Sequence, residues 1–448
     1  LNPSSVCSST NYAVDTDELS NYCGGQDGEA TYNGLVHSYS NLYGHGNPDL
    51  HLALQPIGLN TIKGIRGDEM LLVGSVLALS TYTGDSLLLN NERAIFRDQL
   101  NGGFDFNVGD LVVQNYDTRL FDRMKKSRFD QWYTFNQSEN LHLSFASANY
   151  DHNNNQLNDD MGIYTSFTSG NQTFYSGHNY SMDQLLGLRN GNNAFSVLTS
   201  HNNDNSFLTL TEAAGKGQLF GNNIKIDSNT TLNIVAYTGE NDQQALDEKG
   251  FLASISNATD NYNDITFFIG QNLEEDSILR INGKGAFGNL SGETLHTGFT
   301  FNSHIHNNLH IAGLANLGIS NNKSEEYGLI SNFNDILTSQ FNVGLVATGV
   351  SSSNDLISLN ISQPLRTEGG TVNLNLPSTM NLDGTHNFNI KKINLEPSGR
   401  EINFDFGYEM QLHNKSAFRI GSQITLEPSH IKNNSSNELV YGSYKIQF

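Results

Sequence analysis

The chain has 448 residues, with 24 basic and 46 acidic side chains and a formal net charge of −22. Hydrophobic residues make up 37% of it and charged residues 16%, with 42 glycines but only 7 prolines, and this composition excludes a coiled coil, a helical bundle and a proline-rich disordered chain. The acidic excess argues against a nucleic-acid partner, because phosphate backbones are bound by lysine and arginine.

The first sixty residues are rich in Ser, Asn, Gly and Tyr and show no periodic pattern, so an irregular N-terminal extension is expected. Cys7 and Cys23 are the only cysteines. In an oxidising compartment they would close a short loop through a disulfide, and two free thiols are the alternative. Neither an initiator Met nor the basic and apolar stretches of a signal peptide stand at Leu1, which predicts a processed chain.

Residues 62–130 mix short apolar runs with a basic cluster. The longest apolar run, residues 70–79, is too short for a membrane-spanning helix, which takes about 20 residues. A β-barrel is therefore the only membrane form predicted for this chain. The basic cluster at residues 119–128 is interpreted as a solvated linker, with contact to anionic lipid headgroups as the alternative.

From about residue 140 onward, apolar and polar residues alternate, which predicts antiparallel β-strands. The predicted strands are residues 232–238, 265–269, 295–301, 309–319, 341–349, 357–361, 372–376, 401–412 and 416–426. Their connections alternate in length. The connections at residues 307–308 and 351–354 are short, whereas those at 320–338 and 427–437 are long and polar. Short turns at one end and long loops at the other are typical of outer-membrane barrels.

Residues 401–412 alternate most clearly, with large apolar side chains on one face and carboxylates on the other. If the following turn is centred on Asn414, Glu409 lies opposite Arg419 and the two form an ion pair on the polar face. In a soluble sandwich the apolar face would be the core. In an outer-membrane barrel it would meet lipid while the polar face lines the lumen. The predicted pair fits both structures.

The C-terminal strand alternates up to the last residue, with Phe448, Ile446 and Tyr444 on one face. A terminal aromatic on such a strand resembles the recognition motif that outer-membrane barrels present to their assembly machinery. The alternating pattern as a whole predicts an all-β transmembrane antiparallel barrel of about 12–16 strands.

Polar clusters give no catalytic, metal or cofactor site. His304, His306 and His310 lie near a predicted hairpin tip, but no carboxylate or cysteine completes a zinc site there. Residues 151–160 and 201–205 carry oxygen ligands that suit calcium, yet lack the spacing of an EF-hand, so polar loops are the simpler interpretation. The charged residues expected to face the lumen are Glu401, Asp405, Glu409, Arg419, Arg280 and Lys284.

Several motifs resemble one family when taken in order. Residues 43–50 (YGHGNPDL), continuing to 54–58 (LQPIG), resemble the closing stretch of a subtilisin-like (S8) serine protease in a bacterial autotransporter. Residues 361–370 (ISQPLRTEGG) resemble the barrel motif of that group, and residues 398–401 (SGRE) and 428–430 (PSH) fit the same pattern. The resemblance implies a protease in the precursor, but no "GTS"-type turn with a catalytic serine occurs in this sequence, and the resemblance places those groups upstream of Leu1.

The resemblance implies three parts: residues 1–60 as the tail of the protease passenger, 61–135 as a linker or plug, and 136–448 as the barrel translocator. It implies that the barrel anchors and exports the passenger in the outer membrane of a Gram-negative bacterium, with loops at the cell surface. The expected partners are outer-membrane lipid, the barrel assembly machinery and the passenger itself. The alternatives are a stand-alone pore or structural surface protein, and a soluble secreted β-rich adhesin.

Overall fold

The computed structural model describes most of the chain after residue 54 and one hairpin before it. The described residues are 28–32, 35–39, 55–114, 132–138, 140–146, 150–151, 156–157, 162–180, 182–185, 209–211, 217–240, 247–260, 263–306, 308–322, 328–381, 385–413 and 416–446. Within them no helix is both long and apolar enough to cross a membrane.

The N-terminal part contains short strands and 3₁₀ turns. They are β1 (Gly28–Tyr32), β2 (Leu35–Tyr39), β3 (Thr61–Lys63), β4 (Glu69–Leu71), β5 (Val76–Leu79), η2 (Thr81–Thr83), β6 (Arg93–Arg97), β7 (Gly103–Asn107), η3 (Val108–Leu111) and β8 (Val112–Gln114).

The remainder is dominated by long strands. They are β9 (Trp132–Ser138), β10 (Leu141–Ala146), β11 (Tyr150–Asp151), β12 (Gln156–Leu157), β13 (Ile163–Ser169), β14 (Gln172–His178), β15 (Gly217–Lys225), β16 (Thr230–Glu240), β17 (Asp247–Ala258), β18 (Asp264–Glu274), β19 (Asn282–Lys284), β20 (Gly292–His306), β21 (Leu309–Asn322), β22 (Ile330–Thr348), β23 (Asp355–Met380), β24 (His386–Asn394), β25 (Ile402–His413), β26 (Ser416–Leu426) and β27 (Asn437–Ile446). One short helix and two 3₁₀ turns lie between strands: α4 (Met182–Leu185), η5 (Gly285–Phe287) and η6 (Pro428–His430).

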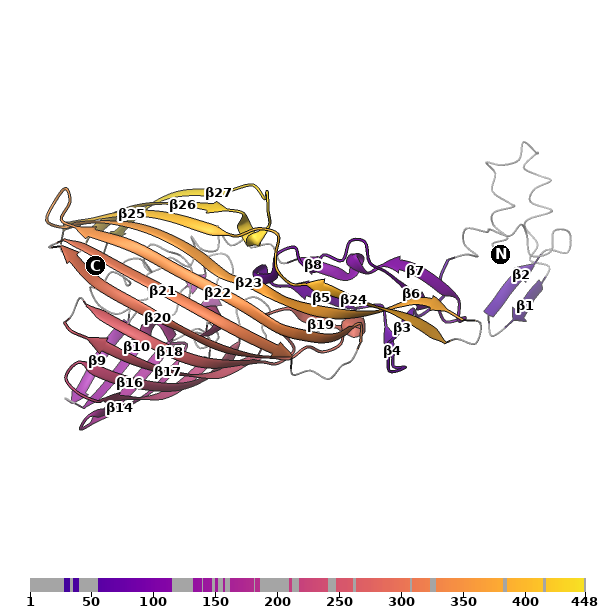
Figure 1. The fold of residues 1–448 in the computed structure, drawn as a ribbon, viewed down its shortest axis with the longest axis horizontal. Coiled ribbons are helices and arrows are strands. Elements are labelled where there is room, and N and C mark those ends of the chain that lie inside the picture. Colours follow the sequence, from indigo (N-terminus) through magenta and orange to yellow (C-terminus); the bar gives the residue numbers. More distant parts are fainter. Residues whose placement is uncertain are drawn as a thin grey trace. The chain divides into compact units, whose positions relative to one another are not determined.

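One antiparallel sheet of sixteen strands forms the body of the molecule. Fifteen of them follow one another as hydrogen-bonded neighbours in the order β27-β26-β25-β23-β22-β21-β20-β18-β17-β16-β15-β14-β13-β10-β9, and β24 pairs with β23 alone. The sheet curls round into a barrel (Figure 1). The all-β antiparallel barrel predicted from alternation is confirmed.

The two ends of the barrel differ in their connections. At one end the strands are joined by short turns, such as residues 349–354 between β22 and β23 and 414–415 between β25 and β26. At the other end the connections are long, such as residues 179–216 between β14 and β15 and 275–291 between β18 and β20. We call the first the turn end and the second the mouth. Strand β27 starts at the mouth, beside the end of β26.

Two expected boundaries were wrong. Residues 357–361 and 372–376 were expected to be separate strands, but both belong to β23, which runs without interruption from Asp355 to Met380. The long loop expected at residues 320–338 is shorter, because β22 already begins at Ile330.

A small layer of chain, residues 62–96 and 105–114, packs on the mouth, and we call it the cap. Strand β5 of the cap pairs antiparallel with β19 from the β18–β20 connection and parallel with β8. One apolar core is shared by the cap, the mouth connections and the mouth ends of β22 and β23. Its most buried members include Ile62, Leu77, Leu79, Leu87, Val108, Ile278, Leu279, Phe287, Leu329, Ile336, Val372 and Leu374. The cap and the barrel mouth are therefore one folded structure.

By internal contacts the chain forms two units. The barrel and cap make one unit, and the other comprises residues 1–61 and 97–104. In that second unit β1 and β2 form an antiparallel hairpin, and the Asp98 carboxylate accepts hydrogen bonds from the backbone N–H groups of Ile57, Leu100 and Gly102.

Candidate functional site: the mouth of the barrel

The barrel wall has two chemically different faces. Along successive strands, one face carries partly exposed apolar side chains and the other carries buried polar ones. The exposed apolar side chains include Phe220, Ile234, Phe251, Phe267, Ile269, Leu295, Phe299, Leu317, Val343, Leu359, Phe404, Phe406, Ile420 and Ile424. The buried polar side chains include Asn233, Asn272, Thr294, His296, Thr300, Asn316, Thr338, Asn342, Asn360 and Asn403. Such a wall presents an apolar surface outward and directs many polar side chains inward.

Glu409 and Arg419 lie on the polar face, directly opposite one another in the β25–β26 register. Arg419 Nε donates to Glu409 Oε2 at 2.9 Å, and a second guanidinium nitrogen contacts the same oxygen. Nearby, Asn360 Nδ2 donates to Asp405 Oδ2 at 3.1 Å. The structure thus brings the expected pair together in the register that a turn centred on residue 414 requires.

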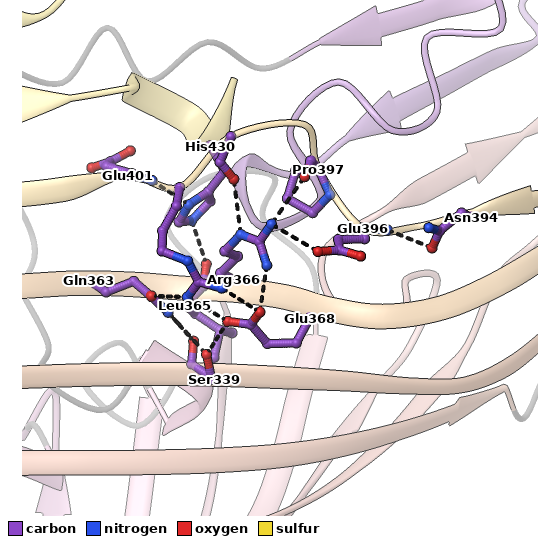
Figure 2. Close-up of polar contacts among 12 residues, drawn as sticks. Ser339, Gln363, Leu365, Arg366, Glu368, Asn394, Glu396, Pro397, Glu401 and His430 are labelled. Atoms are coloured by element: carbon purple, nitrogen blue, oxygen red, sulfur yellow. Dashed lines mark hydrogen bonds and ion pairs between the residues drawn. The ribbon is translucent and has the colours of Figure 1, made fainter. Parts of the chain in front are cut away.

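A network of charged side chains ties strands and loops together at the mouth (Figure 2). At its centre is Arg366 of β23, whose side chain is 5% exposed. Its guanidinium donates to Glu368 Oε2 at 2.5 Å, to the carbonyls of Gly399 (3.0 Å) and Pro397 (3.1 Å), and to Glu396 Oε1 (3.4 Å). Planar guanidinium groups suit such multiple fixed contacts. Arg366 therefore fastens the β24–β25 connection to β23.

Glu368 joins this connection to two strands of the wall. Arg400 donates to both of its carboxylate oxygens, at 2.8 and 2.7 Å, which is the bidentate geometry of the strongest ion pairs. Ser339 Oγ of β22 donates to Glu368 Oε1 at 2.5 Å, and Gln363 Nε2 donates to Ser339 Oγ at 3.0 Å. Arg400 also reaches the side-chain oxygen of Gln363.

His430 of η6 closes the other side of the network. Its Nδ1 accepts from the Glu401 N–H at 2.9 Å, and its Nε2 lies 3.0 Å from the Leu365 carbonyl. Glu401 Oε2 in turn accepts from the Ser429 N–H at 2.7 Å. Burial lowers the pKa of His430 to about 3, so the ring is neutral and Nε2 is the donor to Leu365.

The cap is attached to the same network. Asp85 of the cap accepts from the Ser398 N–H at 2.9 Å and from Ser398 Oγ at 2.7 Å. Beside it, Gly84 has a φ of +49°, and a Cβ there would lie 2.8 Å from Pro397 Cβ and 2.8 Å from the Ser429 carbonyl. Glycine at this position thus allows the cap backbone to approach the mouth loops closely.

Three sequence motifs converge in this network. The motifs are residues 361–370, 398–401 and 428–430, each of which resembles a segment of the same family. At the mouth their polar groups form hydrogen bonds with one another. That contact could not be predicted from the motifs, because only the strand register brings the three segments together. Ser339 and the cap residue Asp85 carried no motif and were missed.

Other expected site residues lie apart from the mouth network or outside the described part of the chain. Tyr444 is exposed on β27, and Ile446 ends that strand. Several predicted residues lie outside the part of the chain that the structure describes. They are Cys7, Cys23, Phe448, residues 119–128 and 201–205, and most of 151–160. Lys284, expected in the lumen, is exposed on β19, whereas Arg280 is buried in the β18–β20 connection beside Glu248.

Two of the histidines at the β20–β21 turn stack on one another. His304 and His310 pair across the turn and their rings stack with centroids 4.7 Å apart. In the described residues, no group of three or more His, Cys, Asp or Glu side chains is placed to hold a metal ion.

Comparison with known proteins gives only distant similarities. No family model matches the chain, and no curated protein matches it. Among solved structures, the outer-membrane protein OmpT of Vibrio cholerae in its trimer form is 10% identical, with 70% of this chain and 89% of that one covered and a TM-score of 0.42. OprB of Pseudomonas putida is 12% identical, with 68% and 81% covered and a TM-score of 0.38. The monoaromatic hydrocarbon channel CymD is 9% identical, with 77% and 94% covered and a TM-score of 0.27. At these values no function of the chain follows from any of them.

Proposed function

We propose that this chain is an outer-membrane β-barrel that anchors and exports the polypeptide preceding it. The apolar outer face would contact lipid hydrocarbon, which removes the cost of leaving so many aromatic and aliphatic side chains in water. The partners would be outer-membrane lipid, the barrel assembly machinery and the exported segment. The passenger would be a subtilisin-like serine protease, as the motifs near residues 43–58 and 361–370 imply by resemblance.

One observation carries the proposal: the end of the barrel at which the N-terminal part joins it. Neighbouring strands are antiparallel, and β9 and β27 stand at the two ends of a path of fifteen strands. They therefore run in the same direction, so β9 starts at the mouth, where β27 also starts. The first strand of the barrel therefore begins on the side of the long connections. If the mouth faces the cell exterior, this arrangement supports a passenger that lies outside the cell without a second crossing of the barrel.

The test is to place one epitope tag at several positions and probe intact cells of a Gram-negative host that expresses the full chain. Tags in the mouth loop 432–436 and directly before residue 55 should bind antibody on intact cells. The same tag in the turn 349–354 should bind only after the outer membrane is permeabilised, and it serves as the matched control. Labelling of the turn tag alone on intact cells would overturn the proposed orientation.

The protease passenger needs a separate measurement. A fluorophosphonate probe that reacts with activated serines should label the precursor that includes the upstream region. A precursor that stays unlabelled while its tags report the expected orientation would retain the anchoring function and contradict the protease.

A further inference from the structure

The parts of the β14–β15 connection that the structure describes contact the inner wall of the barrel. Two of its residues, Tyr180 and Met182, are 8% and 1% exposed. They belong to an apolar cluster with Leu219, Val235, Leu252 and Phe268, which point inward from β15 to β18. The Tyr180 ring stacks on that of Tyr164 from β13, with centroids 4.5 Å apart. The first part of the connection is thus packed against the inner wall.

The last described part of this connection, Thr209–Thr211, bonds to distant parts of the wall. Tyr237 of β16 donates its hydroxyl to the Leu210 carbonyl at 3.3 Å. Gln340 of β22 donates to Thr209 Oγ1 at 3.0 Å. Five strand spacings of about 4.8 Å separate β16 from β22, or roughly 24 Å along the wall. Three consecutive residues reach both strands only by lying across the interior.

Arg280 holds the same segment from the mouth side. It is 3% exposed, and its Nη2 donates to the Thr209 carbonyl at 3.3 Å. Its Nε contacts Glu248 Oε1 at 3.3 Å, and its guanidinium lies 5.6 Å from the centre of the Tyr82 ring in the cap. A buried arginine paired in this way is costly to disturb, because removing one partner leaves a buried charge. Arg280 therefore links the internal segment, the wall and the cap.

Several polar side chains of the inner wall are shielded from water. His296 and Asn316 are each 1% exposed, and Asn302, two residues below Thr300 toward the turn end, is 2% exposed. Polar side chains that line an open aqueous channel would be accessible to solvent. Their burial indicates that protein fills the interior beside these residues.

We propose that the β14–β15 connection, through Tyr180, Met182 and Thr209–Thr211, closes the lumen, so that the folded barrel does not conduct ions. Arg280 is the residue that positions Thr209–Thr211 across the interior. This goes beyond the anchoring function, because it identifies which part of the chain occupies the lumen. It also differs from the expectation that residues 61–135 act as the plug.

The test is conductance of the purified full chain in a planar lipid bilayer. The wild type should give no steady conductance. The double variant Arg280→Ala with Gln340→Ala, which loses the hydrogen bonds of both side chains to Thr209, should open channels at least tenfold more often than any brief openings of the wild type. Gln423→Ala is the matched control: Gln423 is also buried on the inner wall, and we expect the control to stay closed. A steadily conducting wild type, or a folded double variant as silent as the control, would overturn the proposal.

A cross-link keeps the proposal testable if the double variant fails to fold. A Cβ at Gly318 would lie 3.4 Å from Leu210 Cδ1 and 2.5 Å from Thr338 Oγ1. The variant Leu210→Cys with Gly318→Cys, made with Thr338→Ala for space and with Cys7→Ser and Cys23→Ser, should be bridged by a short bifunctional methanethiosulfonate, detectable by mass spectrometry. A folded barrel in which these two cysteines react with the reagent but are not bridged would refute the internal placement of the segment. Neither measurement depends on surface display, so failure here is distinguishable from failure of the anchoring function.

Discussion

His430 makes the mouth network sensitive to acid. Both ring nitrogens are already engaged, with Nδ1 accepting from the Glu401 N–H and Nε2 donating to the Leu365 carbonyl. A proton on Nδ1 would break the first of these bonds. The pKa of about 3 in the folded protein lies below the roughly 6.5 of an unfolded histidine. The unfolded chain therefore binds more protons between these values, and the stability contribution, fully present above pH 6.5, is lost as pH falls toward 3.

We expect His430→Gln to flatten this dependence, because an amide can make both hydrogen bonds but does not titrate. The wild type should lose up to about 1.4 kcal/mol of unfolding free energy per pH unit from this group below pH 6.5. The readout is the heat-induced conversion between folded and unfolded forms on a gel, measured from pH 7.5 to 4.5. His306→Gln, a change at an exposed position, should keep the wild-type slope. Equal slopes for wild type and His430→Gln would contradict this role.

At the level of single residues, sequence reasoning placed Glu409 opposite Arg419. The two residues are only ten apart in one hairpin, so the position of the turn and their opposite charges were enough to predict the pair. It did not place Arg366 against Gly399 or Asp85 against Ser398, because such contacts depend on the register of strands and on how the cap packs. The motifs marked those segments as unusual but carried no information about their partners.

Among the elements, β23 shows why a strand boundary was misplaced. Residues 357–361 and 372–376 were expected to be separate strands, and Pro364, Gly369 and Gly370 lie between them. Proline removes a ladder hydrogen bond and glycine weakens strands, so both are unusual inside a long strand. The β22–β23 register skips Pro364 at a bulge opposite residues 339–341, so no ladder bond is lost there. Gly370 has a φ of +130°, a conformation that glycine adopts readily. The strand therefore continues through these bulges, and its C-terminal part pairs with β24.

The packing of the cap on the mouth depends on Phe287 of η5, and we expect Phe287→Ala to detach the cap from the mouth. Phe287 is fully buried in the core shared by cap and mouth, and removing a buried phenylalanine costs about 3–5 kcal/mol. Since about 1.4 kcal/mol corresponds to a factor of ten, proteolysis within residues 62–96 should be at least about a hundredfold faster.

Phe267→Ala is the matched control for this prediction, because Phe267 is half exposed on the outer face of β18. It removes the same atoms without touching the shared core, and its cap should resist protease like the wild type. Equal cleavage rates for the two variants would show that the cap does not rely on Phe287.

For the whole molecule, alternation in the sequence predicted the fold class, since a period of two fixes which side chains share a face. It could not predict what fills the interior. Inward positions on β15–β18 are apolar and aromatic as well as polar, and Tyr180 and Met182 of the β14–β15 connection pack against the apolar ones. The cap was likewise unexpected, because residues 62–114 lack any periodic pattern.

The measurement that tests the account most directly is nitroxide accessibility on the outer face of the barrel in lipid bilayers. Single labels at Phe404→Cys, Phe406→Cys and Ile420→Cys, on a background without Cys7 and Cys23, should be relaxed strongly by oxygen and weakly by a water-soluble nickel complex, because hydrocarbon excludes the complex. A label at Lys432→Cys in the mouth loop should show the reverse. If the nickel complex relaxes the Phe404 and Phe406 labels as strongly as the Lys432 label, these side chains do not face lipid and the membrane barrel is contradicted.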